Sequence, residues 1–509
     1  MKLNKHLSIL TIAVAIAGIG CKKFIDVNKN PNSAQSAGAA LIFTNGLNAY
    51  ATSLAGGANL IGNYWGGFWA HSTSFTTGGP EKTYNFTNGN FNYWTGIFDN
   101  LTDLQHVIRV ADKEGLSYLK GPAKIIKALR YQELVDIYGN VPFSEAFKGL
   151  AVFQPKYDKG EDIYDSLIVM LDEAIADLKK HDFPVTFPGN IYTINDAHDP
   201  ADWVRFANTA KLRILMRLNN MPARQNFVRT EIQKILTEGS GFINPGGDVT
   251  SNPGYLKAAG KMNPFYFWAG YDENDATTTG YRLYRMSQYL VDTLKQNNDT
   301  IRLKYLAAVP DSRRPAGATD AYMGNVADYS GVPFGGETNN AYLSANSSNV
   351  GPARIIRGQA SAPQVIFTAA ECLFLQAEAA QRFGIAGLGN PQTLYEQGIR
   401  ESFRLLGASD QAAANLIGKS ANFVTAPDKV KAILYQKWVA MANFNGLEAW
   451  SEFRRNDYPA IPLSINRARL PERPVRLYYP QDEYSTNINN VNAQGEINVF
   501  TSRIFWDVK

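Results

Sequence analysis

Aromatic side chains gather in glycine-containing stretches that also carry Asn, Asp and Thr, and these are the residues most suited to bind a ligand. The flat face of an aromatic ring can stack on the apolar face of a sugar, while amides and carboxylates bind its hydroxyl groups. We name eight candidate ligand-binding residues: Tyr64, Trp65, Phe68, Trp69, Tyr84, Tyr266, Trp268 and Tyr271. The alternative, which the sequence leaves open, is that these rings fill the core beneath irregular loops.

The sequence motifs of common catalytic sites are missing from the chain. The histidines lie far apart and form no HExxH motif, and no G-x-S-x-G nucleophile elbow occurs. A stretch from Gly254 to Lys261 is one residue too long for a P-loop, and Met262 stands where Ser or Thr would hold magnesium. We therefore expect no catalytic residues, no metal ligands and no cofactor, and we predict that the protein is not an enzyme.

An acidic cluster and one cysteine remain as possible chemical groups. Asp272, Glu273 and Asp275 could offer oxygen ligands to calcium, but their spacing differs from an EF-hand and favours a solvated loop. Cys372 lies in an apolar run, which is typical of a small buried hydrophobic residue and not of a nucleophile.

Composition narrows the class of protein. The chain has 509 residues, of which 45% are hydrophobic and 19% charged, with a net charge of +4 and two cysteines. This much apolar material excludes global disorder, and two cysteines exclude a disulfide scaffold. The small net charge gives no general attraction to nucleic acid, so we expect no such partner.

The N-terminus indicates export and lipidation. Lys2 and Lys5 precede an apolar run that ends at Gly20-Cys21, which predicts a signal peptide over residues 1–20. A small residue followed by Cys resembles a bacterial lipobox, although Gly18 stands where a lipobox prefers Leu. We expect acylation of Cys21 and a lipidated tether over residues 21–36, since several acyl chains anchor a protein stably. An unlipidated signal peptide is the alternative.

Helical periodicity dominates the remainder. Over 161–180, apolar residues recur every three or four positions, which predicts an amphipathic helix. Similar patterns predict helices at 39–54, 97–111, 122–138, 201–219, 225–238, 283–296, 364–381, 391–406 and 428–444. Paired helices favour a mainly α fold with a tetratricopeptide-like helical-hairpin core. Long loop-rich insertions are expected at 55–96, 240–282, 307–362 and 457–509, all within one domain spanning 37–509.

Several segments in order resemble the SusD/RagB family, in its SusD-like branch from Bacteroidetes. They are Cys21–Pro31, Tyr138-Gly-Asn-Val-Pro142, Trp203–Arg217, Phe367–Glu378, Tyr395–Arg400, Gln436–Arg455 and Arg476–Pro480. Asn140 stands where the family's turn has Asp. We read most of these residues as structural, with Arg213, Arg217, Glu371 and Glu378 forming internal ion pairs and Trp438 and Trp450 lying in the core.

The resemblance implies a non-catalytic, nutrient-binding lipoprotein on the outer face of the outer membrane. It would capture oligosaccharide and pass it to a TonB-dependent SusC-like barrel, as a hinged lid on that transporter. Peptide or another nutrient is the alternative ligand. A surface glycoside hydrolase is a third possibility, and it would require two carboxyl groups about 5–9 Å apart in a cleft.

Overall fold

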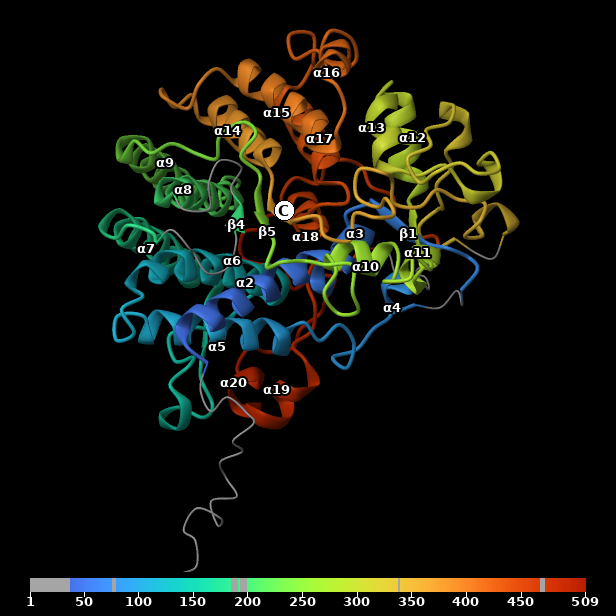
Figure 1. Ribbon diagram of the computed structural model, residues 1–509. Helices are drawn as coiled ribbons and strands as arrows, with labels where there is room; N and C mark the ends of the chain where they lie inside the picture. The colour runs from blue at the N-terminus through green and yellow to red at the C-terminus, as the bar shows by residue number, and fades with distance from the viewer. Residues whose placement is uncertain (1–36, 76–78, 185–190, 193–198, 337–338, 467–471) are drawn as a thin grey trace, which may run out of the picture.

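Helices make up most of the computed structural model, which describes residues 37–75, 79–184, 191–192, 199–336, 339–466 and 472–509 (Figure 1). The expected signal peptide at 1–20, the lipidation site Cys21 and the tether at 21–36 lie outside the described residues. The predicted mainly α fold is confirmed.

The first half of the chain builds a row of helices in which each packs on the next. Within it α2 packs on α5, α5 on α6, α6 on α7 and α7 on α8 (Figure 1). The bounds are α2 Ala39–Ala55, α5 Trp94–Val110, α6 Lys120–Tyr138, α7 Gly160–Lys180, α8 Pro200–Arg217 and α9 Gln225–Glu238. All of these helices were predicted, with ends within three residues of those observed.

Helix α7 shows how the pattern produces the packing. Its apolar stripe, Ile163 to Leu178, is buried against α6 and α8. Glu161 and Asp162 occupy its first turn and Lys179 and Lys180 its last turn, so the charges at both ends complement the helix dipole.

Helix α14 is the central helix of the second half. Its Thr368 cap accepts a hydrogen bond from the Glu371 backbone N–H (3.0 Å), and Gly384 ends the helix with a positive φ of 61°. It packs on α8, α15 and α17, so nearly all of its side chains are buried. The helices of this half are α14 Ala369–Phe383, α15 Pro391–Leu406, α16 Asp410–Ile417, α17 Lys429–Met441 and α18 Gly446–Asn456.

Shorter elements lie between these helices, several of them in stretches that were expected to be loops. Short α-helices are α3 Gly57–Trp65, α4 Pro80–Thr83, α10 Pro264–Ala269, α11 Thr279–Leu283, α12 Gln288–Gln296, α13 Thr300–Leu306, α19 Gln481–Thr486 and α20 Ile488–Asn492. Single 3-10 turns occur at Ser117–Leu119, Gly149–Ala151, Pro222–Arg224, Asp311–Arg313, Val326–Asp328 and Asn340–Tyr342.

The described residues form three small antiparallel sheets, two of which join distant parts of the chain. The strands are β1 Trp69–His71, β2 Val141–Pro142, β3 Tyr157–Asp158, β4 Ile191–Tyr192, β5 Val249–Ser251, β6 Tyr284–Met286 and β7 Gln364–Phe367. β1 pairs with β6 (Trp69 opposite Met286), β2 with β3 (Val141 opposite Asp158), and β5 lies between β4 and β7. The prediction of one helix over 283–296 is therefore wrong at its start, which is strand β6.

The expectation of a loop over 55–96 is wrong where α3 lies. A Cβ atom on Gly62 would come within 2.3 Å of the Leu447 backbone N, and one on Gly446 within 2.3 Å of the Asn63 N. Glycine at these two positions therefore lets α3 and α18 approach closely. The glycines that suggested a loop in the sequence instead serve helix packing.

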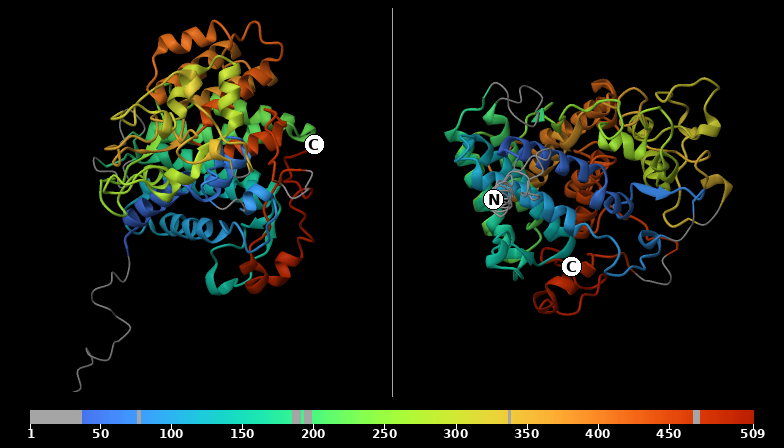
Figure 2. Two further views of the ribbon diagram at one scale, coloured as in Figure 1. Left: turned by 90° about the vertical axis from the view of Figure 1, so that its right-hand side faces the viewer. Right: turned by 60° about the horizontal axis from the view of Figure 1, so that its bottom comes forward.

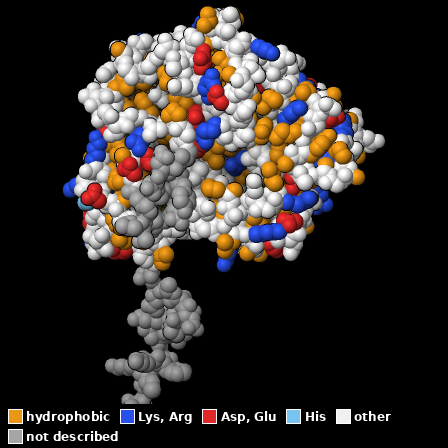
Figure 3. All heavy atoms as spheres, turned by 45° about the horizontal axis from the view of Figure 1, so that its top comes forward, with side chains coloured by type: hydrophobic (Ala, Val, Ile, Leu, Met, Phe, Trp, Pro, Cys, Tyr) orange, Lys and Arg blue, Asp and Glu red, His pale blue; other side chains and the backbone are white. Residues whose placement is uncertain are grey.

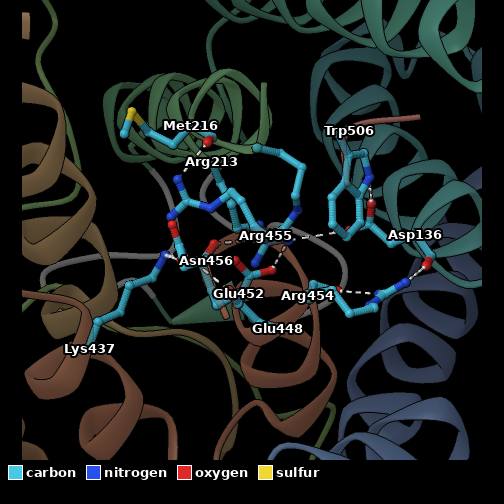
Figure 4. Close-up of polar contacts among 12 residues, drawn as sticks. Asp136, Arg213, Met216, Lys437, Glu448, Glu452, Arg454, Arg455, Asn456 and Trp506 are labelled. Carbon is cyan, nitrogen blue, oxygen red and sulfur yellow. Dashed lines mark hydrogen bonds and ion pairs between the residues drawn. The ribbon is translucent and has the colours of Figure 1, made fainter. Parts of the chain in front are cut away.

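Buried ion pairs hold the two halves together (Figure 4). Arg217 on α8 pairs with Asp136 on α6 (3.3 Å) and with Glu448 (2.5 Å) and Glu452 (2.7 Å) on α18. Arg213, also on α8, pairs with Glu371 of α14 (3.4 Å), and Arg455 of α18 pairs with Glu378 of α14 (2.8 Å). The predicted structural role of the family's charged residues is confirmed, as is the core position of Trp438 and Trp450.

Opposite charges around Glu452 keep it ionised in the interior. Burial acts to raise the pKa of Glu452, but Arg455, Lys437 and Arg217 together hold it well below its usual value. The C-terminal segment joins the cluster, since Trp506 Nε1 donates a hydrogen bond to Asp136 Oδ1 (2.8 Å). Removing one charge would leave others uncompensated, so the network fixes the relative positions of α6, α8, α14 and α18.

Candidate functional site

Seven of the eight aromatic candidates are buried in the core. Only Trp268 among them exposes much of its side chain, at 46%. The buried seven are Tyr64, Trp65, Phe68, Trp69, Tyr84, Tyr266 and Tyr271. In this conformation their ring faces are covered, so the expectation that they stack on a ligand is corrected to a role in packing.

Contacts within the protein account for these buried rings. The Trp65 ring meets Trp450 edge-on (centroids 5.0 Å apart), and Trp69 stacks on Tyr284 (5.0 Å). The two indole N–H groups also have internal partners: Trp65 Nε1 donates to the Glu81 carbonyl (3.1 Å) and Trp69 Nε1 to Asn443 Oδ1 (2.8 Å). Their partners come from distant parts of the chain, which a local reading of the sequence could not supply.

Trp268 is exposed because of the way α10 begins and packs. Asn263 caps this helix, its Oδ1 accepting from the Tyr266 N–H (2.9 Å), and Pro264 occupies the first turn. The helix buries Phe265 and Tyr266 and leaves Phe267 and Trp268 toward solvent, with 45% of Phe267 exposed. Two neighbouring aromatic side chains therefore form an accessible apolar platform.

The Trp268 indole stands between two hollows. One, which we call the Arg130 hollow, has a volume of about 280 Å³. The other, the Lys261 hollow, has a volume of about 560 Å³. Trp268 and Thr52 line both, so a ligand crossing from one hollow to the other would pass the indole. We define the Trp268 site as these two hollows together with Phe267 and Trp268.

Polar groups line the Arg130 hollow. Arg130 forms an ion pair with Glu133, and its Nη1 donates to Ser53 Oγ (2.8 Å). The buried Arg130 Nε has no hydrogen-bond partner among the described residues. Burial raises the pKa of Glu133 above its usual value, although Arg130 opposes this effect. The exposed Asn92 adds a donor and an acceptor suited to hydroxyl groups, whereas the amide of buried Asn59 is bonded to the backbone of Leu54 and Leu447.

A glycine pair between α2 and α3 opens this hollow. Gly57 has a φ of +51°, a left-handed conformation that favours glycine. A Cβ on Gly56 would lie 3.6 Å from the Trp268 ring, so a longer side chain there would reach the indole. The helix break thus brings backbone, not side chains, to the edge of the platform.

The Lys261 hollow has a mixed lining of apolar and polar residues. Pro253, Leu256, Met262 and Phe267 contribute to it, and Tyr255 donates from its hydroxyl to Asn48 Oδ1 (2.9 Å). Together the two hollows combine aromatic faces with hydroxyl-binding groups. This arrangement can bind a chain of sugar rings or another amphipathic ligand.

Two carboxylates of the acidic loop beside α10 have partners within the protein. Asp272 Oδ1 accepts from the backbone N–H groups of Asn274 and Ala276 (both 2.9 Å), and Asp275 pairs with Lys257 (2.5 Å). Within the described residues, no group of three His, Cys, Asp or Glu side chains could hold a metal ion. The interpretation of residues 272–275 as a solvated loop fits these contacts better than calcium binding.

Cys372 is fully buried, as predicted. Burial raises the pKa of its thiol to about 12, so it stays protonated at neutral pH.

Comparison with known families identifies the chain. A family sequence model described as "Starch-binding associating with outer membrane" matches residues 31–480. The chain belongs to the SusD-like family. The predicted family is therefore confirmed, and with it an association with glycan or nutrient binding and with the outer membrane.

Solved structures share the SusD-like fold over nearly the whole chain. A SusD homologue from Bacteroides fragilis has a TM-score of 0.75 at 22% identity, covering 93% of this chain and 99% of its own. A chitin-binding SusD homologue from Flavobacterium johnsoniae has a TM-score of 0.71 at 22% identity, covering 92% and 98%. No curated protein matches this SusD-like chain.

The surface and the helices carry two further observations. On the face in Figure 3, basic and acidic side chains are interspersed with hydrophobic ones. Among the described residues, no helix is both long enough and apolar enough to cross a bilayer.

Reading the sequence missed Phe267, Arg130, Glu133 and Thr52 as parts of the site. Asn263-Pro264 before a run of aromatic residues is the signal for a capped short helix that could have indicated Phe267. Arg130 and Glu133 carry no local signal, because they belong to a long helix whose facing elements come from other parts of the chain.

Proposed function

We propose that this protein captures an oligosaccharide at the Trp268 site and delivers it to a TonB-dependent SusC-like barrel in the outer membrane. The observation that carries the ligand class is the exposed Trp268 indole between two hollows, one of which holds Arg130, Glu133, Asn59 and Asn92. Membership of the SusD-like family supports the same role, as does the chitin-binding homologue among the similar structures.

We propose that the role is binding without catalysis. Of the described residues that line the two hollows, Glu133 is the one carboxylate, and Arg130 is paired with it. Glycoside hydrolysis by the usual mechanisms needs two carboxyl groups flanking the scissile bond. The lining of the Trp268 site therefore favours holding a sugar over cleaving it.

We further propose that Cys21 is acylated and anchors the protein to the outer membrane at the cell surface. Support comes from the lipobox-like Gly20-Cys21 and from the family's outer-membrane association. Acyl chains on Cys21, followed by a polar tether, would allow the folded part to move over the barrel as a lid.

Calorimetry tests the ligand class and the site. Protein beginning after Cys21 is titrated with triacetylchitotriose, maltotriose, cellotriose and tripeptides. We expect binding of a saccharide, with affinity reduced about tenfold or more in Trp268→Ala because aromatic stacking and apolar contact are lost. Phe153→Ala is the matched control, since it removes an exposed aromatic side chain away from the two hollows.

Two results would contradict the proposal. Binding of tripeptides alone would assign the site to peptide. Equal saccharide affinity in the wild type and in Trp268→Ala would show that the saccharide does not bind at the Trp268 site.

A further inference from the structure

A third hollow lies on another part of the molecule, and the proposed function does not use it. Its volume is about 550 Å³, and it lies among α12, α15, α17, the segment 420–428 and the residues after α18. Tyr289, Thr293, Asp299, Tyr435 and Tyr458 contribute to its lining, and we call it the Tyr435 hollow. It shares no lining residue with the two hollows beside Trp268.

Packing within the protein holds the walls of this hollow in place. The rings of Tyr289 and Tyr435 lie against buried Trp438, with centroids 5.6 and 6.0 Å away. In the neighbouring segment, Lys429 Nζ donates to the carbonyls of Phe423 (2.6 Å), Val424 (2.7 Å) and Ala426 (2.8 Å). The hollow is therefore pre-formed, which lowers the entropy cost of binding a ligand.

Two residues that line the hollow each carry a buried polar atom without a partner. The Tyr435 hydroxyl and Asp299 Oδ1 make no hydrogen bond to any described residue. The Asp299 side chain is nearly fully buried and is oriented by Arg302, whose Nε donates to Asp299 Oδ2 (2.8 Å). Buried polar groups are normally paired, so a free hydroxyl and a free carboxylate oxygen in one hollow indicate a missing partner.

Charge and chemistry define that partner. Arg302 neutralises Asp299, and Asp428 and Lys431 contribute opposite charges to the lining, so the hollow does not select an ion. A sugar hydroxyl can donate to Asp299 Oδ1 while another accepts from the Tyr435 hydroxyl. The half-buried rings of Tyr289, Tyr435 and Tyr458 offer surface to the apolar side of such a ligand.

Room for more than one sugar ring is present. A neighbouring hollow of about 600 Å³ shares Asp299, Leu416 and Ser420 with the Tyr435 hollow. We propose that the Tyr435 hollow is a second saccharide-binding site, for a neutral oligosaccharide, which acts independently of the Trp268 site. A chain with two such sites would hold a long glycan at two places.

The test uses the Trp268→Ala protein, in which binding at the Trp268 site is expected to be weaker by about tenfold or more. In this background, Tyr435→Phe removes the unpartnered hydroxyl and nothing that the fold uses, and Ser420→Trp places a bulky group at the exposed junction of the two neighbouring hollows. Tyr329→Phe is the matched control, because it removes a buried tyrosine hydroxyl outside these hollows. Binding of triacetylchitotriose, maltotriose and cellotriose is measured by saturation-transfer NMR and calorimetry, and melting temperature is recorded for every variant.

We expect Trp268→Ala to retain binding of at least one of the three saccharides. Tyr435→Phe should weaken that binding about tenfold, as for one lost hydrogen bond, without lowering the melting temperature. Ser420→Trp should weaken it also, and Tyr329→Phe should not.

Two results would overturn the second site. The first is that Trp268→Ala binds none of the saccharides at about 10 mM. The second is that adding Tyr435→Phe or Ser420→Trp to Trp268→Ala leaves the saccharide affinity unchanged. Comparing wild type with Trp268→Ala separates this failure from that of the proposed function. Binding by wild type alone would support the Trp268 site and contradict the second site. Equal binding by both proteins would contradict the Trp268 site and leave the second site supported.

Discussion

Glu371 occupies a position where burial and ion pairing oppose one another. Burial raises the pKa of Glu371 to about 7, although Arg213 of α8, whose Nη1 lies 3.4 Å from Glu371 Oε1, acts against it. The folded protein then holds a proton that the unfolded chain releases near pH 4.5. Stability therefore falls as pH rises through the window from about 4.5 to about 7.

Glu371→Gln should remove this part of the pH dependence, because glutamine cannot ionise. We expect the free energy of unfolding of the variant to improve relative to wild type as pH rises from about 4.5 to about 7, and to run parallel to it at lower pH. Urea unfolding at a series of pH values measures this difference. A difference that is constant across the window would mean that Glu371 ionises with its usual pKa.

The difference between Trp268 and the other aromatic residues marks the limit of reading the sequence residue by residue. Tyr266 and Trp268 are two positions apart in the same aromatic run, yet one is buried and the other half-exposed. Residue type predicts a capacity for stacking, but exposure depends on how α10 rests on the rest of the molecule. The sequence therefore identified a small set of aromatic residues that could stack on a ligand, but it did not show which of them is exposed.

Helix α10 is short, so its cap matters for the site it carries. Asn263 accepts from the Tyr266 N–H (2.9 Å), and its Nδ2 donates to the Ala362 carbonyl (2.9 Å). We expect Asn263→Ala to cost about 1 kcal/mol and to weaken saccharide binding at Trp268, although Asn263 does not line either hollow there. Urea unfolding and calorimetry measure the two effects.

Asn263→Asp is the matched variant, because it keeps the oxygen that caps the helix. It should restore part of the affinity lost in Asn263→Ala, because it keeps the cap and loses the donor to the Ala362 carbonyl. Unchanged saccharide affinity in Asn263→Ala would show that the position of Trp268 does not depend on this cap.

Long helices were predictable because their periodicity alone defines them. The predicted ranges 225–238 and 391–406 coincide with α9 and α15. Helix α3 was missed because its sequence, Gly57 to Trp65, carries two glycines and two asparagines, which locally favour a loop. Its stability comes from packing on α18, nearly four hundred residues later, where Gly62 and Gly446 permit close contact.

At the scale of the whole molecule, the sequence predicted that charged residues would form internal ion pairs, but it did not predict which residues pair with which. Arg217 meets Asp136, Glu448 and Glu452 across separations that no local pattern encodes. The same applies to the Arg130 and Tyr435 hollows, whose linings come from several elements. The fold could be predicted from the family resemblance, whereas the positions of the hollows could be found only from the structure.

One end of the molecule combines two features that suit a lid on a membrane transporter. The blue N-terminal end of α2 lies toward the bottom of Figure 1, on the side where α19 and α20 lie, and Figure 2 agrees. The loop 148–156 packs on α19 and α20, since Gln154 Nε2 donates to the Thr486 carbonyl (2.9 Å). On this loop Leu150 and Phe153, three positions apart, are 94% and 77% exposed, which is unusual for two large apolar side chains so close together.

If this end docks on the barrel proposed above, replacing both side chains with Asp should weaken the complex and spare the ligand site. We expect Leu150→Asp/Phe153→Asp to reduce co-purification with the barrel about tenfold or more, because two apolar contacts are replaced by charges that must be desolvated. Saccharide affinity of the isolated protein should stay the same. Val169→Asp on α7 is the control, since it charges an exposed apolar position on another element. Full co-purification of the double variant would place the docking surface elsewhere on the molecule.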